Sequence, residues 1–367
     1  MPAPDVEPAT PAYDAVLLLG FGGPEGQDDV IPFLRNVTRG RGIPEARLEA
    51  VATHYRARGG ISPVNAQNRA LKAALETELA GRGIDLPVYW GNRNWTPYLG
   101  DTVTEAAAAG HTRMLALTTS AYSSYSSCRQ YREDLAQALD HTGLAGRVAL
   151  DAVRPYFDHP GFVTPFIDGL RAALADLAGR QIASVDTHIL FTTHSIPTTD
   201  AAASGPRDRD WGPGGAYVAQ HRAVAEVIMA ALAPGASPAW SLAFQSRSGP
   251  PGMPWLEPDV NDAIADLAAA GRSAVVVVPL GFISDHMEVI WDLDTEAAAT
   301  AAALGLAFLR VSTPSLHPAF VAGLVDLLME RLPADPDPVR KALTTLGPWR
   351  DACQAGCCEK AAARRPD

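Results

Sequence analysis

The chain has 367 residues and a mass of 38.8 kDa, a size that predicts about two domains rather than one. Its 30 basic and 41 acidic side chains give a net charge of -11, which argues against nucleic acid as the main partner. The longest strongly apolar stretch without charge, residues 297–309, is shorter than the roughly 20 residues that cross a bilayer. We therefore expect no transmembrane segment. Residues 1–12 lack the basic and apolar parts of a secretory signal and predict a disordered leader, so a cytoplasmic location is expected.

Eight short apolar runs follow in chain order, and each one leads into a polar loop. Four runs begin at Ala15, Pro87, Arg113 and Arg147, and four more begin at Thr187, Ala239, Ser273 and Leu306. Stretches with helical spacing lie between them, at residues 65–79, 99–109, 216–232 and 260–269. The runs are continuously hydrophobic, which is typical of parallel strands that helices cover on both faces.

The two sets of runs have the same order, which indicates an internal duplication. We expect an α/β protein of two similar doubly wound, Rossmann-like lobes, each with a four-stranded parallel sheet, and a cleft between them. The predicted parts are an N-terminal lobe (13–158), a C-terminal lobe (159–318), a C-terminal helix that returns to the N-terminal lobe (319–350) and a cysteine-containing tail (351–367). Ligands of such sheets bind beyond the carboxyl ends of the strands, so the loops there are the candidate site.

His194 directly follows the fifth run, at the carboxyl end of a predicted buried strand. A lone histidine in a loop is more often structural, but this position favours a functional role. Glu288, Asp292 and Glu296 follow the seventh run at spacing i, i+4, i+8, which places three carboxylates on one stripe of a helix. The stripe could be a solvated acidic face. Its apolar neighbours indicate burial instead, and imidazole with carboxylate suits Fe2+ or proton exchange with a ligand.

A third group of residues combines glycine, hydroxyl and aromatic side chains. It comprises residues 59–65, 91–95 and 118–131. Turn-forming residues and aromatics at a sheet edge would explain this composition. A flat, apolar ligand rimmed by carboxylates would explain it better, with Arg93, Ser62 and Tyr131 within reach of the rim. The glycine-rich loop GFGGPEG lacks the order of a dinucleotide fingerprint and carries little weight.

Four segments, LLLGFGGPEG, YRARGGISPVN, THSIP and GFISDHMEVIWDLDTE, together resemble the ferrochelatase family over about residues 15–320. The resemblance implies a lyase that inserts Fe2+ into a porphyrin held between two lobes. It makes His194 and Glu288 the catalytic pair that handles the pyrrole protons and the iron. Asp292 and Glu296 would form an outer metal site. Ser62 and Tyr131 fall where the family holds porphyrin carboxylates.

The resemblance is strongest to bacterial members that use coproporphyrin III in heme biosynthesis. Phe21 stands where many of those relatives have a tyrosine as axial iron ligand, and the pair Arg93 and Asn94 differs from their Lys-His. These three are nevertheless expected to line the porphyrin. Coproporphyrin III has four propionates, for which Arg39, Arg41 and Arg93 are candidate partners. Protoporphyrin IX is the alternative substrate. A more distant alternative for the function is a non-catalytic carrier of a tetrapyrrole or a metal. Such a carrier would not need the two proton acceptors His194 and Glu288, so their presence favours the enzyme.

The four cysteines are unevenly placed, because three of them, Cys353, Cys357 and Cys358, crowd near the C-terminus and Cys128 lies far earlier. In a reducing compartment this suggests metal rather than disulfides. The resemblance implies a [2Fe-2S] cluster held by all four thiolates, as in bacterial members with a C-terminal extension. Free thiols in a frayed tail are the alternative. We expect a monomer whose other partners are transient heme-pathway enzymes.

Overall fold

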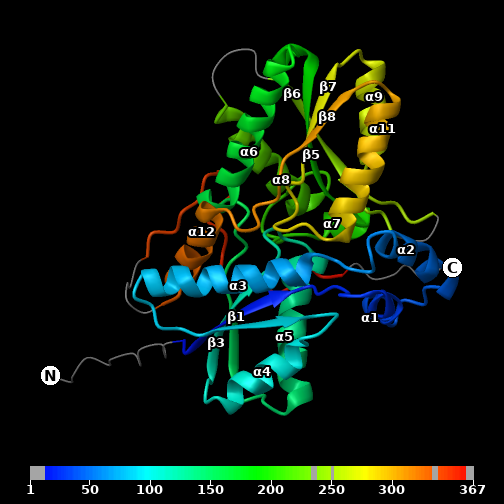
Figure 1. The fold of residues 1–367 in the computed structure, drawn as a ribbon. Coiled ribbons are helices and arrows are strands. Elements are labelled where there is room, and N and C mark those ends of the chain that lie inside the picture. The colour runs from blue at the N-terminus through cyan, green and yellow to red at the C-terminus, as the bar shows by residue number, and fades with distance from the viewer. Residues whose placement is uncertain (1–12, 233–237, 249–251, 333–337, 361–367) are drawn as a thin grey trace.

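The structure is a computed structural model that describes residues 13–232, 238–248, 252–332 and 338–360. The predicted leader (1–12) and the last residues of the tail (361–367) lie outside the described residues. Two lobes lie one above the other (Figure 1), with α3 running along the boundary between them and the pair α1 and α2 at one side of it.

Each lobe contains one four-stranded sheet whose strands are all parallel. The first sheet has the order β2-β1-β3-β4, from β1 (Ala15–Gly20), β2 (Val88–Asn92), β3 (Arg113–Thr118) and β4 (Ala149–Ala152). The second has the order β6-β5-β7-β8, from β5 (Thr187–His194), β6 (Ala239–Gln245), β7 (Ala274–Val278) and β8 (Ala307–Arg310). The same order in both sheets confirms the predicted fold class of two similar doubly wound lobes.

Helices connect the strands. Those of the first half are α1 (Val30–Val37), α2 (Glu45–Arg56), α3 (Val64–Gly81), α4 (Leu99–Ala108) and α5 (Gln130–Thr142). Those of the second half are α6 (Pro160–Gly179), α7 (Thr198–Ala202), α8 (Gly215–Ala230), α9 (Val260–Ala269), α10 (Met287–Val289), α11 (Ala298–Ala303) and α12 (Pro318–Met329). Their ends follow local chemistry: the side chain of His159 accepts from the Gly161 N–H to cap α6, and α5 stops at the left-handed Gly143.

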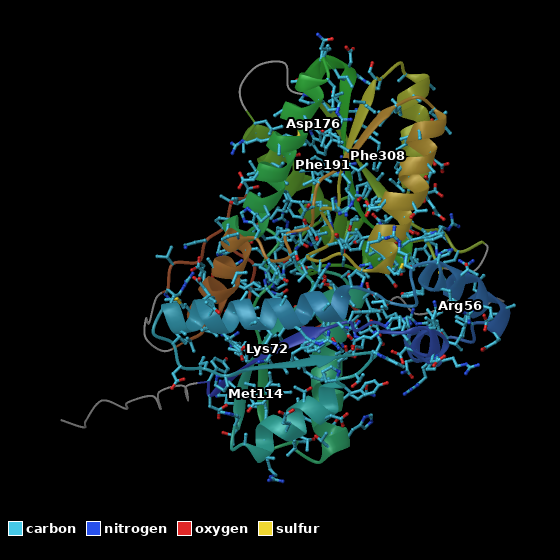
Figure 2. All side chains as sticks on the ribbon, viewed as in Figure 1. Arg56, Lys72, Met114, Asp176, Phe191 and Phe308 are labelled. Carbon is cyan, nitrogen blue, oxygen red and sulfur yellow. The ribbon has the colours of Figure 1, made fainter. Side chains whose placement is uncertain are left out.

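Apolar packing holds each lobe together and joins the two lobes. A large central core joins the facing sides of both sheets with α3, α6 and α12, and it includes Leu18, Leu75, Phe166, Phe191 and Phe320. Smaller cores cover the outer face of each sheet. In Figure 2, Phe191 and Phe308 lie in the upper lobe and Met114 in the lower one. Because the central core is continuous between the lobes, the strand ends at their boundary are held in fixed relative positions.

The chain after β8 binds both lobes. Helix α12 packs against α3 of the first lobe and α6 of the second. Its Asp326 pairs with Arg82, at the end of α3, with a distance of 2.6 Å. The buried Arg154, just after β4, pairs with Glu330 at 2.8 Å and with Asp158 at 3.1 Å. No helix within the described ranges has the length and hydrophobicity needed to span a membrane.

Candidate active site

His194 is the last residue of β5, at the carboxyl end of the second sheet. Its Nδ1 hydrogen-bonds to the carbonyl oxygen of Ser195, which can only accept, so Nδ1 carries the proton. In the neutral ring, Nε2 then keeps its lone pair. That atom lies 3.7 Å from Oε2 of Glu288, and both side chains are partly exposed, by 32% and 49%. The structure thus brings the predicted pair together, with both members contributed by the C-terminal lobe.

A second imidazole, His286, lies beside this pair. Its Nδ1 accepts the backbone N–H of Glu288 at 3.2 Å and lies 3.8 Å from that residue's carboxylate. Burial lowers the pKa of His286, an effect that Glu288 opposes and His194 reinforces. The sequence analysis did not select His286. His286 could have been predicted from its position in the loop after β7, because His194 was selected for its position at the end of β5.

The predicted regular stripe of carboxylates differs from the structure. After the short α10 the chain forms a π-helix, Ile290–Ala297, before it continues as α11. A π-helix pairs residues five apart, and accordingly the indole Nε1 of Trp291 donates to Oε1 of Glu296 at 2.8 Å. The acids therefore have three separate environments: Glu288 beside His194, Asp292 against β6, and Glu296 exposed on Trp291.

Asp292 is the most strongly perturbed of the three acids. Burial raises its pKa to about 7, with further increases from Glu288 and Glu296 that the hydrogen bond from Ser246 partly offsets. Ser246 Oγ donates to Oδ2 of Asp292, and Gln245 Nε2 lies 3.4 Å from the same oxygen. This carboxyl therefore keeps its proton to a higher pH than an ordinary aspartate. Gln245 and Ser246 were also missed, although they stand at the carboxyl end of β6.

The candidate porphyrin residues of the first lobe gather at the end of β1. Phe21 is 39% exposed there, and its carbonyl accepts both the backbone N–H and the side-chain amide of Asn94, at 3.0 and 3.3 Å. The guanidinium of Arg93 lies over the Tyr131 ring at 4.1 Å and near the Phe21 ring at 6.0 Å. Arg93 also pairs with Asp134. These contacts make one wall of aromatic and cationic groups.

Ser62 and Tyr131 lie inside the lobe behind this wall, with exposed fractions of 3% and 4%. Ser62 donates its N–H to Pro24 O at 2.9 Å, and a Cβ on Gly23 would lie only 2.7 Å from the Ser62 Cβ. The Tyr131 hydroxyl lies 3.3 Å from Thr119 Oγ1. Tyr131 therefore carries the Arg93 guanidinium on its ring, and Ser62 packs against the loop after β1. Arg39 and Arg41 are exposed beyond α1, where Arg39 donates to the Asn36 side chain at 2.7 Å.

The pair α1 and α2 connects the two sides of the site. Phe33 on α1 makes edge contacts with Phe21 at 6.3 Å and with Tyr55 on α2 at 6.0 Å. His54 on α2 stacks on Trp291 of the π-helix at 4.2 Å, with nearly parallel rings. Burial, together with the charges of Glu288 and Asp292, raises the pKa of Tyr55. Helices α1 and α2 thus contact both the aromatic and cationic wall of the first lobe and the acidic π-helix of the second lobe.

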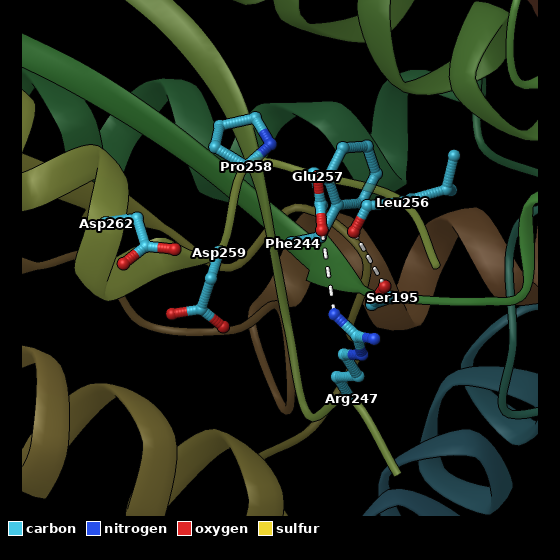
Figure 3. A pocket seen from close by; sticks show the side chains of 8 residues that line it. All are labelled: Ser195, Phe244, Arg247, Leu256, Glu257, Pro258, Asp259 and Asp262. Atoms are coloured by element: carbon cyan, nitrogen blue, oxygen red, sulfur yellow. Dashed lines mark hydrogen bonds and ion pairs between the residues drawn. The ribbon is translucent and has the colours of Figure 1, made fainter. Parts of the chain in front are cut away.

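A cavity of about 380 Å³ adjoins the catalytic candidates without including them (Figure 3). It is lined by Ser195, Phe244, Arg247, Leu256, Glu257, Pro258, Asp259 and Asp262. Ser195 Oγ donates to Leu256 O at 2.9 Å, and Arg247 lies 3.6 Å from Glu257. The cavity therefore lies beside Ser195, the residue that follows His194.

The four cysteines come from distant segments to one place. Cys128, on the short π-helix Tyr125–Arg129, hydrogen-bonds with Cys353 and Cys358, which together with burial raises its pKa. Hydrogen bonds from Cys128 and Cys357 lower the pKa values of Cys353 and Cys358. Cys357 Sγ and Cys358 Sγ are 3.8 Å apart. Across the described ranges, no group of three or more His, Cys, Asp or Glu side chains is placed to hold a metal ion.

Two doubly wound lobes, with an imidazole and carboxylates at the strand ends of one lobe, define a chelatase-type architecture. The model of the ferrochelatase family matches residues 13–332, and the chain belongs to this family. This confirms the predicted resemblance, and with it the class of enzyme, a porphyrin metal chelatase and hence a lyase.

Relatives in several bacteria are similar over nearly the whole chain. Coproporphyrin III ferrochelatase of Leifsonia xyli subsp. xyli is 62% identical over 356 residues, which cover 95% of this chain and 91% of that protein. The protein of the same name from Streptomyces griseus subsp. griseus is 54% identical, with 94% and 93% covered. A ferrochelatase of Rhodopirellula baltica is 45% identical, with 97% and 96% covered.

Among solved structures, SirB from Bacillus subtilis with Fe3+ is similar with a TM-score of 0.50. The match covers 87% of this chain and 95% of SirB at 11% identity, so it supports the fold alone.

Proposed function

We propose that the protein inserts Fe2+ into coproporphyrin III to give coproheme, a step of heme biosynthesis. The observation that carries the proposal is the free Nε2 of His194, which faces the Glu288 carboxylate at 3.7 Å at the boundary of the lobes. The names of the relatives from Leifsonia and Streptomyces support coproporphyrin III as the substrate.

The reaction exchanges two pyrrole N–H protons for one Fe2+, so the site needs two proton acceptors and a path for the cation. His194 is the base for one pyrrole proton, because its Nε2 lone pair is not used inside the protein. Glu288 takes the second proton or balances the charge of protonated His194. His194 and Glu288 are also the groups that hold the incoming Fe2+, since imidazole and carboxylate both suit that ion. Binding the macrocycle rim supports the bending that exposes the pyrrole lone pairs.

Asp292 and Glu296 form the outer metal site of this proposal. Glu296 is exposed and fixed by Trp291, so it meets a hydrated cation first. Asp292, with a pKa of about 7, either exchanges a proton or binds the cation. Together they provide a route that ends at Glu288.

The first-lobe wall is assigned to the porphyrin. Phe21 packs on a face of the macrocycle, and Arg93 and Asn94 meet its rim. Ser62 and Tyr131 belong to the same porphyrin-binding region, in its buried part. Arg39 and Arg41 supply further cations for the two additional propionates of coproporphyrin III.

Cys128, Cys353, Cys357 and Cys358 are proposed to hold a [2Fe-2S] cluster. The chemistry of the donors supports this, because the four thiols interact with one another and such a cluster takes four thiolates distributed over two irons; in the described residues they are not yet placed around one metal ion. Bound there, the cluster would supply a redox-sensitive link between the tail and the first lobe. Its ligands would come from residue 128 of that lobe and from the tail alone.

Further proposals concern the whole protein. We assign residues 13–158 and 159–318 to the two lobes, 319–350 to the returning helical segment and 351–367 to the cysteine tail. The protein is proposed to act in the cytoplasm as a monomer that meets other heme-pathway enzymes transiently.

Anaerobic turnover with Fe2+ tests the substrate assignment. Coproporphyrin III and protoporphyrin IX are compared at matched concentrations, and the rate is followed by loss of free-porphyrin fluorescence. A kcat/KM higher by at least about tenfold for coproporphyrin III is expected, equivalent to about 1.4 kcal/mol. Faster turnover of protoporphyrin IX would reassign the substrate, and no turnover of either would point to a carrier.

A further inference from the structure

Tyr217, on α8, connects the end of β5 with the rest of the second lobe. Its buried hydroxyl donates to the carbonyl oxygen of His194 at 2.9 Å and lies 2.7 Å from Thr193 Oγ1. The phenol thus bonds to both residues that end the strand. The same peptide group is also held at its nitrogen, because the Ser195 N–H donates to Gln245 O at 2.7 Å. The peptide that follows His194 is therefore fixed at both its oxygen and its nitrogen.

The backbone of Tyr217 is held in turn by the residues that contact the cysteine tail. Its N–H donates to Ser204 Oγ at 2.9 Å, and the next residue, Gly205, donates its N–H to Cys358 Sγ at 3.1 Å. Gly205 has a φ of +86°, and a Cβ there would lie 2.3 Å from the Ala216 Cβ. The Ser204–Gly205 turn is thus closely packed between the tail and the start of α8.

We propose that Tyr217 is a positioning residue for His194, and that the Ser204–Gly205 turn couples this placement to Cys358. The inference rests on the proposed function, because it takes His194 as the base. His194 must present Nε2 to its target, and a small displacement of a reacting group is costly for the rate. Loss of the Tyr217 hydroxyl frees the His194 carbonyl, and loss of Cys358 frees the turn that holds Tyr217.

The chain offers a matched control for Tyr217→Phe. Tyr122 is equally buried, with exposed fractions of 2% for Tyr122 and 6% for Tyr217. Its ring stacks on His221 at 3.6 Å, but within the described part of the chain its hydroxyl has no hydrogen-bond partner. Tyr122→Phe therefore removes the same atom from a similar environment without breaking a bond to the strand.

The measurement combines kinetics with NMR of histidine-labelled protein, in which the His194 ring signals are assigned from their loss in His194→Ala. Tyr217→Phe is expected to lower kcat by about five- to tenfold with little change in the porphyrin KM, and to shift the His194 ring signals. Tyr122→Phe should leave both unchanged. An unchanged His194 spectrum in Tyr217→Phe, or equal shifts in both variants, would overturn the positioning role. If Tyr217→Phe does not fold, Ser204→Ala loosens the same residue from its other end and should shift the same signals.

A double-variant cycle tests the link to the tail. Cys358→Ala is expected to shift the His194 signals in the same direction as Tyr217→Phe, and the double variant should shift them no further than Tyr217→Phe alone. Additive shifts, or no shift in Cys358→Ala, would overturn the coupling. Failure of the proposed function is seen separately, as full chelation activity in His194→Ala, and it would leave these spectral shifts in place.

Discussion

Glu288 is the residue whose chemistry is easiest to isolate, because its amide analogue keeps the shape and removes the base. Glu288→Gln should lower the rate of iron insertion by at least about 100-fold, the usual scale for a lost acid or base. Steady-state kinetics with the porphyrin substrate measures this effect. Glu296→Gln is the control, since Glu296 is exposed and bonds to Trp291 rather than facing His194. A larger loss in Glu296→Gln than in Glu288→Gln would reverse the two roles.

Asp292 gives a prediction about stability and pH in the metal-free protein. Folding raises its pKa from 3.8 to about 7, so its contribution to stability is intact below about pH 4 and is lost as the pH rises through 7. Asp292→Asn should therefore have a higher free energy of unfolding than the parent protein at pH 8, by up to about 4 kcal/mol, and the difference should shrink toward pH 4. Denaturant titrations at several pH values check it. A constant difference across this range would show that the raised pKa is not the cause.

Arg154 connects the segment after β4 with the segment after α12 at the boundary of the lobes. It is 1% exposed, pairs with Asp158 and Glu330, and donates to the Lys341 carbonyl at 2.8 Å. Removing one partner of a buried ion pair leaves charge uncompensated, so Arg154→Ala should lower the free energy of unfolding by about 3 to 5 kcal/mol.

The exposed pair of Arg180 and Asp176 on α6 supplies the control, because surface ion pairs contribute little. Thermal unfolding of Arg154→Ala and Arg180→Ala should therefore give very different losses. Similar losses would mean that the Arg154 contacts do not connect the elements as described.

The cysteine tail is the second element with a direct test. Replacement of Cys128 by serine should release the cluster and bleach the anaerobically purified protein, because a ligand of the first lobe is lost. Iron and acid-labile sulfide assays measure this. A colourless parent protein without sulfide would remove the cluster from the account, and His194 and Glu288 would keep their roles.

At the level of elements, the eight strands were predictable because buried parallel strands are continuously hydrophobic. The π-helix Ile290–Ala297 was not predictable, since the spacing of the acids fits an α-helix equally well and the longer turn is seen only in the folded backbone. His286 and Ser246 could have been predicted as His194 was, because both lie in the loops after the carboxyl ends of strands. The bonds of Arg154 and Tyr217 depend on tertiary packing, which spacing along the chain does not encode.

For the whole molecule, the proposed function divides two tasks between two lobes whose sheets have the same strand order. The end of β1 carries the aromatic and cationic wall with Phe21 and Arg93, and the ends of β5 and β7 lead to His194 and Glu288. Porphyrin binding and iron insertion should then respond to different substitutions. Under the proposed function, substitution of Arg93 should affect porphyrin binding and substitution of His194 should affect iron insertion.

His194→Ala tests this separation most directly. Coproporphyrin III binding is measured by fluorescence titration and iron insertion by anaerobic turnover, on the same preparation. The account predicts that insertion is lost while the Kd for the porphyrin changes by less than about threefold, because the imidazole acts on protons and metal rather than on the rim. Iron insertion at a near-normal rate in His194→Ala would contradict it.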